Sequence, residues 1–203
     1  MRRLKQLARR SAEGPARALG ALGLTPNALT VIGSLLTGAV GLLAAHGWFA
    51  AAAVGLWVFA ATDTLDGALA RATDRVTVFG AFLDSVCDRY AEAGVFLGIL
   101  WWYQASGDTL GVALTYVAAI GSLMVSYARA RAEGVGLHAE VGWFQRPERI
   151  IVLGLGLLVA TWLPLALAAV LLVLAVLTNL TVVQRVVHVA RLTRAARDPS
   201  LSA

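Results

Sequence analysis

Residues 63–88 read DTLDGALARATDRVTVFGAFLDSVCD and place four aspartates, Asp63, Asp66, Asp84 and Asp88, at regular spacing inside two apolar runs. Asp63 and Asp66 are three positions apart and Asp84 and Asp88 are four apart, so each pair shares one face of a helix. Two such helices side by side would bring four carboxylates together, and unpaired charge is costly in apolar surroundings. Oxygen ligands favour a hard divalent cation such as Mg²⁺, Mn²⁺ or Ca²⁺ over zinc, so the stretch predicts a metal site.

The composition of the 203-residue chain indicates an integral membrane protein. Its residues are 59% hydrophobic and 14% charged, whereas soluble domains are about 45–50% apolar and about 25% charged. The net charge of +5 favours contact of a cytoplasmic face with anionic lipid, and we expect no nucleic-acid partner. A single cysteine, Cys87, excludes an internal disulfide and a cysteine-based zinc site.

Six apolar segments predict membrane-spanning helices, since a bilayer requires about 20 residues. These segments cover residues 28–45, 48–70, 76–103, 109–128, 150–162 and 165–187, of which the fifth is short. Residues 1–24 mix Arg and Lys with Leu and Ala and predict a cytoplasmic amphipathic helix on the membrane surface. Residues 25–190 would then form one membrane domain, and residues 191–203 a basic cytoplasmic tail. The predicted fold is all-α, with six transmembrane helices and an N-terminal amphipathic surface helix.

The basic residues predict the orientation in the membrane. Of the 17 Lys and Arg residues, Arg89 lies within the third span and Arg185 at the end of the sixth, and the other 15 fall on the two terminal segments and on alternate loops. The three opposite turns contain none. The positive-inside rule therefore predicts a multi-pass protein of the plasma membrane, with both termini and the acidic stretch on the cytoplasmic side.

The acidic stretch follows the pattern Asp-x2-Asp-Gly-x2-Ala-Arg-x8-Gly-x3-Asp-x3-Asp. This pattern resembles the signature of the CDP-alcohol phosphotransferases, which are membrane enzymes of phospholipid synthesis. The resemblance implies six spans, an amphipathic N-terminal helix, a homodimer and a donor such as CDP-diacylglycerol. It also implies a cofactor of two Mg²⁺ or Mn²⁺ ions, which can clamp a pyrophosphate during in-line displacement.

The resemblance assigns roles to individual residues. The four aspartates Asp63, Asp66, Asp84 and Asp88 would hold the metal ions, and Asp88 would also be the catalytic base that takes the proton of the acceptor hydroxyl. The positions expected to bind the CDP donor are Asn27, Ala28, Leu29, Thr30, Gly67, Ala70, Arg71, Thr77 and Gly80. The alternative roles are helix packing for Gly67, Ala70 and Gly80 and helix capping at the start of the first span.

The acceptor is predicted from two later segments. SYARARAE at residues 126–133 and RPER at residues 146–149 resemble segments of actinobacterial phosphatidylinositol-phosphate synthases, in which the acceptor is inositol 1-phosphate. The residues expected to bind the acceptor phosphate are Ser126, Arg129, Arg149 and Arg185. Arg129 stands where those enzymes are expected to have Lys, and the two cations are not equivalent.

Three alternatives remain open from the sequence. A phosphatidylglycerol-phosphate synthase would use the same donor with glycerol 3-phosphate. A membrane prenyltransferase would also use Asp-rich motifs with Mg²⁺, but Gly67, Ala70, Arg71 and Gly80 argue against it. A divalent-cation transporter would need polar groups on both sides of the membrane, whereas the outer halves of the predicted spans are almost purely apolar.

Overall fold

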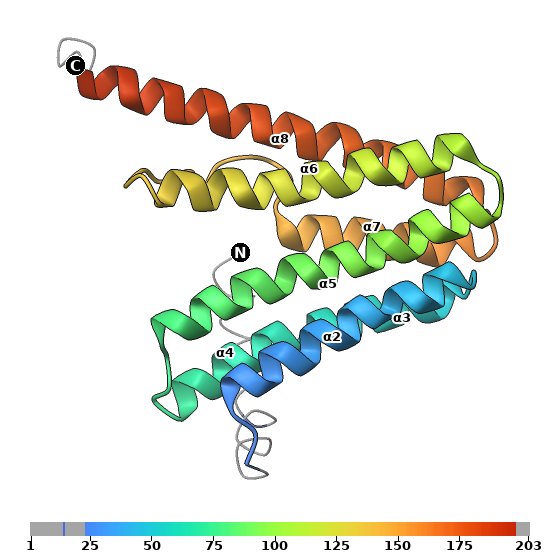
Figure 1. Ribbon diagram of the computed structural model, residues 1–203, viewed down its shortest axis with the longest axis horizontal. Coiled ribbons are helices and arrows are strands. Elements are labelled where there is room, and N and C mark those ends of the chain that lie inside the picture. Colours follow the sequence, from blue (N-terminus) through green and yellow to red (C-terminus); the bar gives the residue numbers. More distant parts are fainter. Residues whose placement is uncertain (1–13, 15–22, 198–203) are drawn as a thin grey trace. The chain divides into compact units, whose positions relative to one another are not determined.

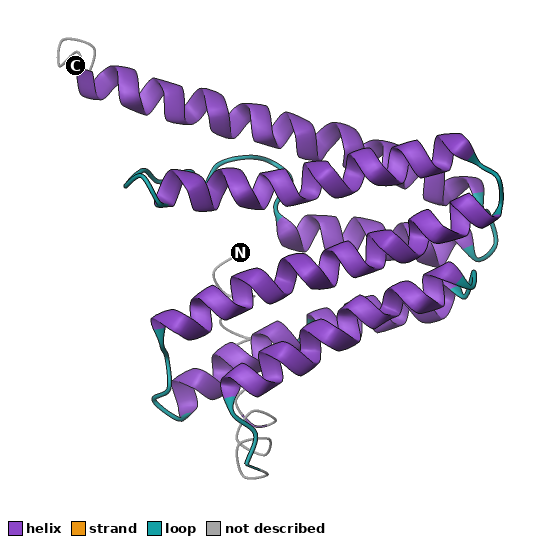
Figure 2. Ribbon diagram, in the orientation of Figure 1, coloured by secondary structure: helices purple, strands orange, loops and turns teal. Residues whose placement is uncertain are grey.

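The computed structural model describes residue 14 and residues 23–197, without the side chains of residues 63, 64 and 195–197. Every regular element of this described part is an α-helix, and Figure 2 shows purple helices joined by teal loops. The helices of Figure 1 are α2 Pro26–Ala45, α3 Phe49–Ala60, α4 Thr62–Ala72, α5 Val78–Ala105, α6 Thr109–Glu133, α7 Arg146–Ala160 and α8 Leu165–Arg197. The predicted surface helix over residues 1–24 and the end of the tail lie almost entirely outside the described residues.

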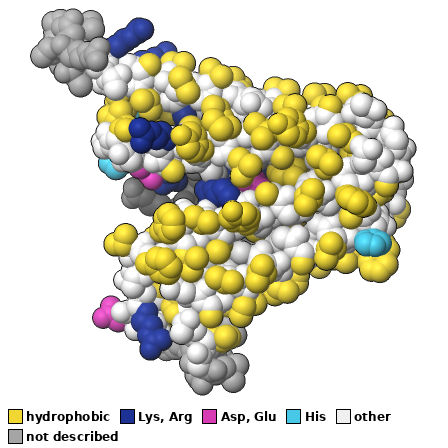
Figure 3. Space-filling model, in the orientation of Figure 1, with side chains coloured by type: hydrophobic (Ala, Val, Ile, Leu, Met, Phe, Trp, Pro, Cys, Tyr) yellow, Lys and Arg dark blue, Asp and Glu magenta, His cyan; other side chains and the backbone are white. Residues whose placement is uncertain are grey.

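Apolar side chains are exposed along the helices, as expected for surfaces that face lipid. Leu35 and Leu42 of α2 are 68% and 66% exposed, and Leu172 of α8 is 52% exposed. Yellow hydrophobic side chains cover much of the face drawn in Figure 3, where charged side chains are few. Together with the long apolar helices, these exposures identify a membrane-integral protein.

The predicted all-helical class is confirmed, but the count of six spans stays a prediction. Within the described residues, four helical segments are long and apolar enough to cross a membrane: Pro26–Ala45, Phe49–Ala72, Thr109–Glu133 and Leu165–Arg194. The helix α5 carries several charged residues in its first half, and α7 has only 15 residues.

Some helix boundaries differ from the prediction. The second predicted span consists of two helices, because the chain turns at Ala61 between α3 and α4. The expected loop over residues 129–149 is shorter, since α6 continues to Glu133 and α7 begins at Arg146. The helix α8 continues through the predicted start of the tail, because residues 188–197 contain no Gly or Pro that would end it.

The chain divides into two compact units, Met1–Trp102 and Tyr103–Ala203. In the first unit α2 packs against α3 and α4. A small apolar cluster of Leu29, Ala68 and Leu69, with Leu65 packed against it, joins the start of α2 to α4. Glycines bring α2 and α5 into backbone contact: a Cβ on Gly94 would lie 2.9 Å from the Cα of Gly38.

The second unit is built on α8, which packs along both α6 and α7. The loop between α6 and α7 returns to α8, where the Phe144 N–H donates to Thr181 Oγ1 at 3.3 Å. Gly142 in this loop has a φ of +114°, and a Cβ there would collide with Thr181. These contacts fix the loop, which carries several of the residues discussed below, against α8.

Candidate active site

A pocket in the first unit forms where the first turns of α2 and α5 meet α4 and the turn that follows it. Its volume is about 170 Å³. It is lined by Pro26, Asn27, Thr30, Asp66, Gly67, Ala70, Arg71, Arg75, Val76, Thr77, Gly80, Ala81 and Asp84. Three stretches that are separate in the sequence therefore contribute nine of the predicted donor and metal residues to one pocket. Two predicted donor residues are not in its wall: Leu29 is buried in the apolar cluster, and the Ala28 N–H donates to Thr25.

Asp66 is the most buried carboxylate in the pocket wall, with 7% of its surface exposed. The hydroxyl of Thr30, on α2, lies 2.6 Å from Asp66 Oδ2 and 3.1 Å from the carbonyl oxygen of Pro26. A hydroxyl has one proton, so the shorter and charge-assisted contact to Asp66 is favoured. This hydrogen bond joins α2 to α4 and fixes the orientation of the carboxylate.

The two signature glycines lie close to polar side chains of the protein itself. A Cβ on Gly80 would meet Thr77 Oγ1 at 3.1 Å and Asn27 Oδ1 at 3.3 Å. Thr77 begins the turn of α5 by accepting the Gly80 N–H at 2.9 Å. A Cβ on Gly67 would meet the Arg71 guanidinium at 3.3 Å. The absence of side chains at both positions leaves room for Asn27, Thr77 and Arg71 to face the pocket.

The other two described aspartates of the signature, Asp84 and Asp88, lie on successive turns of α5. Asp84 lines the pocket, whereas Asp88 is 7% exposed and lies outside the pocket wall. Arg89 Nη1 is 3.2 Å from Asp88 Oδ2 and donates to the Ser85 carbonyl oxygen at 2.7 Å. The ion pair between Asp88 and Arg89 was not predicted, and their adjacency in the sequence is the only signal that could have indicated it.

The described donor set fits a hard divalent cation. Asp66 and Asp84 face one pocket, Asp88 is a buried carboxylate one turn further along α5, and carboxylate oxygens are the ligands that Mg²⁺ and Mn²⁺ prefer. Asp63 lies on α4 one turn before Asp66 and Gly67, but its side chain is outside the described residues. Among the side chains that the structure does describe, no group of three or more His, Cys, Asp or Glu residues forms a metal cluster.

Arg75 is a pocket residue that lies outside the signature pattern. It follows Asp74, whose φ of +52° lies in the left-handed region that Asp tolerates better than most residues. This turn brings Arg75, Val76 and Thr77 into the pocket wall. Arg71 and Arg75 together give the pocket two cations. Their spacing of four positions was the feature of the sequence that could have indicated that both lie on the same side.

The predicted acceptor residues lie in the second unit, on three different helices. Arg129 is on α6, Arg149 is on α7 and Arg185 is on α8; Arg149 and Arg185 are only 2% and 3% exposed. The three guanidinium groups are close enough for Arg129 and Arg149 to repel Arg185 electrostatically. Ser126 is half-buried, one turn before Arg129 on α6.

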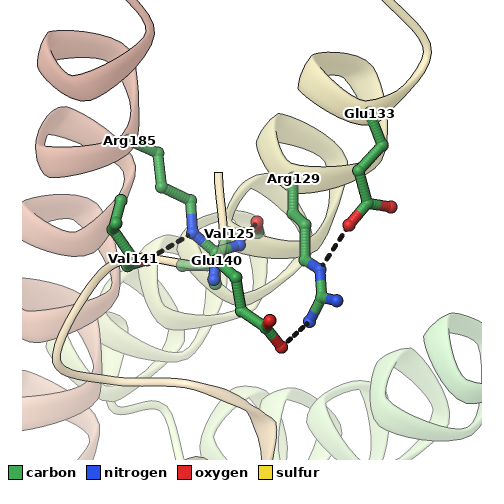
Figure 4. A network of polar contacts seen from close by, with 6 residues as sticks. All are labelled: Val125, Arg129, Glu133, Glu140, Val141 and Arg185. Carbon is green, nitrogen blue, oxygen red and sulfur yellow. Dashed lines mark hydrogen bonds and ion pairs between the residues drawn. The ribbon is translucent and has the colours of Figure 1, made fainter. Parts of the chain in front are cut away.

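Figure 4 shows how two of these arginines are engaged. Arg129 Nε is 2.8 Å from Glu133 Oε1, and its Nη1 is 3.3 Å from Glu140 Oε1 in the loop. Arg185 Nε donates to the Val141 carbonyl oxygen at 2.8 Å, and its Nη1 donates to the Val125 carbonyl oxygen. Arg185 thus connects α8 to α6 and to the loop, a structural role that the sequence did not predict. Three cations against two carboxylates leave this basic cluster (Arg129, Arg149, Arg185, Glu133 and Glu140) with a net positive charge.

Helical architecture, an acidic pocket beside two arginines and a separate basic cluster define the class of the protein. The chain belongs to the CDP-alcohol phosphatidyltransferase family, whose model matches residues 23–194. The phosphatidylinositol phosphate synthase of Mycobacteroides abscessus is 40% identical over 190 residues, which cover 90% of this chain and 84% of the relative.

Solved structures of a second relative share the fold. A crystal structure of the Mycobacterium tuberculosis phosphatidylinositol phosphate synthase with CDP-DAG bound is 38% identical, with a TM-score of 0.83, and the match covers 89% of this chain and 94% of that chain. The same enzyme in complex with manganese and citrate is also 38% identical, with a TM-score of 0.83 and 88% of each chain covered.

Proposed function

We propose that the protein transfers the phosphatidyl group of CDP-diacylglycerol to inositol 1-phosphate and releases CMP. The lipid product is phosphatidylinositol phosphate. The observation that carries the proposal is the pocket in which nine residues of the predicted donor and metal sites meet. The names of the relatives, and the CDP-DAG bound by one of them, support the same donor and product.

In this proposal the first unit binds the CDP donor. Arg71 and Arg75 supply positive charge for the pyrophosphate, and the first turn of α2, with Asn27 and Thr30, lies beside it. Gly67, Ala70, Thr77 and Gly80 provide the wall for the nucleotide. Val78 and Phe79, next to Thr77, are 91% and 60% exposed and keep this edge in contact with lipid, where the diacylglycerol chains would remain.

We assign the metal site to Asp63, Asp66, Asp84 and Asp88, which would hold two Mg²⁺ or Mn²⁺ ions. When bound, these ions neutralise charge on the pyrophosphate and on the departing CMP. Thr30 keeps the Asp66 carboxylate in a fixed orientation by donating to Oδ2, so only its other lone pairs are available for a ligand. The manganese complex of the M. tuberculosis relative supports this choice of metal.

Asp88 is assigned as the general base. It takes the proton of the acceptor hydroxyl while that oxygen forms a bond to the phosphorus of the phosphatidyl group. The bond from that phosphorus to the oxygen of CMP breaks, and its electron pair leaves with CMP. Arg89, whose Nη1 is 3.2 Å from Asp88 Oδ2, holds this carboxylate in place.

The basic cluster of the second unit is assigned to the acceptor phosphate. The buried Arg149 and Arg185, with Arg129 and Ser126, provide an environment in which a phosphate dianion is favourable and a neutral alcohol gains little. Glycerol 3-phosphate carries the same kind of phosphate group. The experiment below therefore offers the two phosphorylated alcohols separately and compares turnover with each. We further propose a homodimer in the plasma membrane with both termini and the active site cytoplasmic, supported by the family and by the distribution of Arg and Lys.

The decisive experiment uses the purified protein with CDP-diacylglycerol and Mg²⁺ or Mn²⁺. Inositol 1-phosphate, free inositol and glycerol 3-phosphate are offered separately, and both CMP release and the labelled lipid product are measured. We expect turnover with inositol 1-phosphate and its loss when EDTA removes the metal. Turnover with glycerol 3-phosphate alone would replace the proposed acceptor, and no CMP release with any alcohol would refute the proposed reaction.

A further inference from the structure

A second groove lies in the second unit, between the loop that follows α6 and the C-terminal third of α8. It encloses about 390 Å³. This interfacial groove is lined by Val141, Gly142, Trp143, Val183, Gln184, Val187, His188 and Arg191. None of the residues assigned to the donor, the metal or the acceptor phosphate is in its wall.

The length of α8 places the interfacial groove at the level of lipid head groups. A helix rises about 1.5 Å per residue, so about 20 residues cross a hydrocarbon core of about 30 Å. Counted from Leu165, where α8 begins, that distance ends near Gln184. Trp143, whose side chain is 76% exposed in the facing loop, is a residue type enriched at this level of the membrane.

The wall of the groove is amphipathic along α8. Val183 and Val187 are 56% and 41% exposed and lie one turn apart. His188 and the exposed Arg191 follow on the next turn and offer hydrogen-bond donors and positive charge. The apolar part thus lies toward the hydrocarbon core and the cationic part toward water, which is the order of the chemical groups in an anionic phospholipid.

Gln184, in the wall of the groove, adds a specific requirement for a ligand. Its Oε1 atom is buried and has no hydrogen-bond partner among the described residues. A buried carbonyl oxygen without a partner costs free energy, and an anion cannot supply the missing donor. Because Oε1 is buried, the Gln184 amide must turn toward the groove to meet a ligand, and a ligand that carries a hydroxyl beside its phosphate can then satisfy both Gln184 and Arg191.

The groove is held in shape before any ligand binds. Arg185 donates to the carbonyl oxygen of Val141, the Phe144 N–H donates to Thr181, and Gly142 approaches Thr181 too closely for any side chain. The loop wall is therefore pinned to α8 on both sides of Trp143. A preformed wall lowers the ordering cost of binding.

We propose that the interfacial groove binds an anionic phospholipid with a hydroxyl-bearing head group. The phosphodiester lies beside Arg191 and His188, a head-group hydroxyl donates to Gln184 Oε1, and an acyl chain runs along Val183 and Val187. This site does not depend on the proposed reaction, because none of its residues belongs to the reaction's machinery.

Thermal unfolding of the purified full-length protein in detergent tests the proposal, with one lipid added at a time. We expect phosphatidylglycerol to raise the Tm more than phosphatidylmethanol, which has the same charge without the hydroxyl, and more than phosphatidylcholine. Arg191→Gln should lose at least half of the rise caused by phosphatidylglycerol. Gln184→Leu should lose the preference for phosphatidylglycerol over phosphatidylmethanol.

Arg194→Gln is the matched control, since it removes an exposed arginine from the same helix three positions outside the groove. It should keep the full rise in Tm, and the Tm of each variant without lipid reports its folding. His188→Gln provides a second groove variant should Arg191→Gln fold poorly. An equal loss in Arg194→Gln, an equal response to phosphatidylmethanol, or the same rise with soluble glycerol 3-phosphate would each overturn the proposal.

Discussion

At the scale of single residues, the two buried aspartates of the first unit have different neighbours. Asp66 accepts a hydrogen bond from an uncharged hydroxyl on another helix, whereas Asp88 is paired with the arginine that follows it. The first arrangement joins two helices through a carboxylate, and the second holds a carboxylate against a cation of its own helix. The proposed roles of the two residues, metal ligand for Asp66 and general base for Asp88, can therefore be tested separately.

Thr30→Val should weaken donor binding, because it removes the hydroxyl that orients Asp66 while keeping the side-chain shape. Hydrogen bonds to charged groups contribute about 1.5–3 kcal/mol, so we expect the Kd for CDP-diacylglycerol to rise roughly 10-fold or more in a binding titration. Thr37→Val is the matched control: Thr37 is also buried on α2, but its hydroxyl donates only to its own helix, at Gly33. Equal effects of the two substitutions would contradict the role given to Thr30.

Asp88→Asn should stop turnover without preventing donor binding. Loss of a general base lowers rates by about 10²–10⁴-fold, so CMP release should fall by that factor while the Kd for CDP-diacylglycerol changes little. Glu92→Gln, one turn further along α5, removes a carboxylate outside the signature and should retain activity. Full turnover by Asp88→Asn would show that another group accepts the proton.

Glu140→Gln should improve the use of a phosphorylated acceptor. Glu140 occupies one side of the Arg129 guanidinium, at 3.3 Å, and competes there with any incoming phosphate. We expect a severalfold lower KM for the phosphorylated acceptor and an unchanged KM for CDP-diacylglycerol. Glu148→Gln, which removes an exposed carboxylate at the start of α7, is the control; a similar change in both variants would indicate a general effect of charge.

At the scale of helices, periodicity in the sequence predicted which residues share a face but not how the chain bends between them. Spacings of three and four positions anticipated that Asp66 and Asp84 could converge, and the structure places both in one pocket. The turn at Ala61 was not predictable, because neither Gly nor Pro marks it. Nor could the sequence show that Arg185 binds backbone carbonyl groups, since every carbonyl group is an equally available acceptor until the chain folds.

Gly98→Ala should destabilise the contact between α2 and α5. A Cβ at Gly98 would overlap the carbonyl oxygen of Gly41, and two backbones cannot yield as a flexible side chain can. Overpacking of this kind costs about 1–3 kcal/mol, which should lower the Tm in detergent. Gly38→Ala is the control on the same seam, because its Cβ would lie an ordinary 3.7 Å from the nearest atom, Ala91 Cα. A stable Gly98→Ala protein would show that the helices can separate at little cost.

At the scale of the whole molecule, the sequence predicts an orientation through the sides on which its basic residues fall. The turn between α5 and α6 contains no Lys or Arg, whereas the α6 C-terminus and the following loop are rich in charge. Helix boundaries now identify exposed positions on both sides: Ala105 ends α5, and Val135 follows α6. Cys87, the one native cysteine, can be replaced so that single labels report each side.

A Cys87→Ser background with Ala105→Cys should react with a membrane-impermeant maleimide on intact cells. In the same background, Val135→Cys should react only after the cells are permeabilised, because the positive-inside rule retains the arginine-rich side in the cytoplasm. The reverse labelling pattern would contradict the proposed orientation. Both positions are exposed, so a lack of reaction cannot be attributed to burial.

The glycine seam between α2 and α5 has a mechanical consequence for the pocket. Backbone touches backbone at Gly41, Gly94 and Gly98, with no side chain between the helices that could be compressed. From Gly41 to Asn27 in the pocket wall, α2 extends about 21 Å. The two helices can therefore tilt about this contact more easily than they can approach each other there. A tilt about the contact displaces the pocket ends of α2 and α5, and the displacement grows with their distance from the seam.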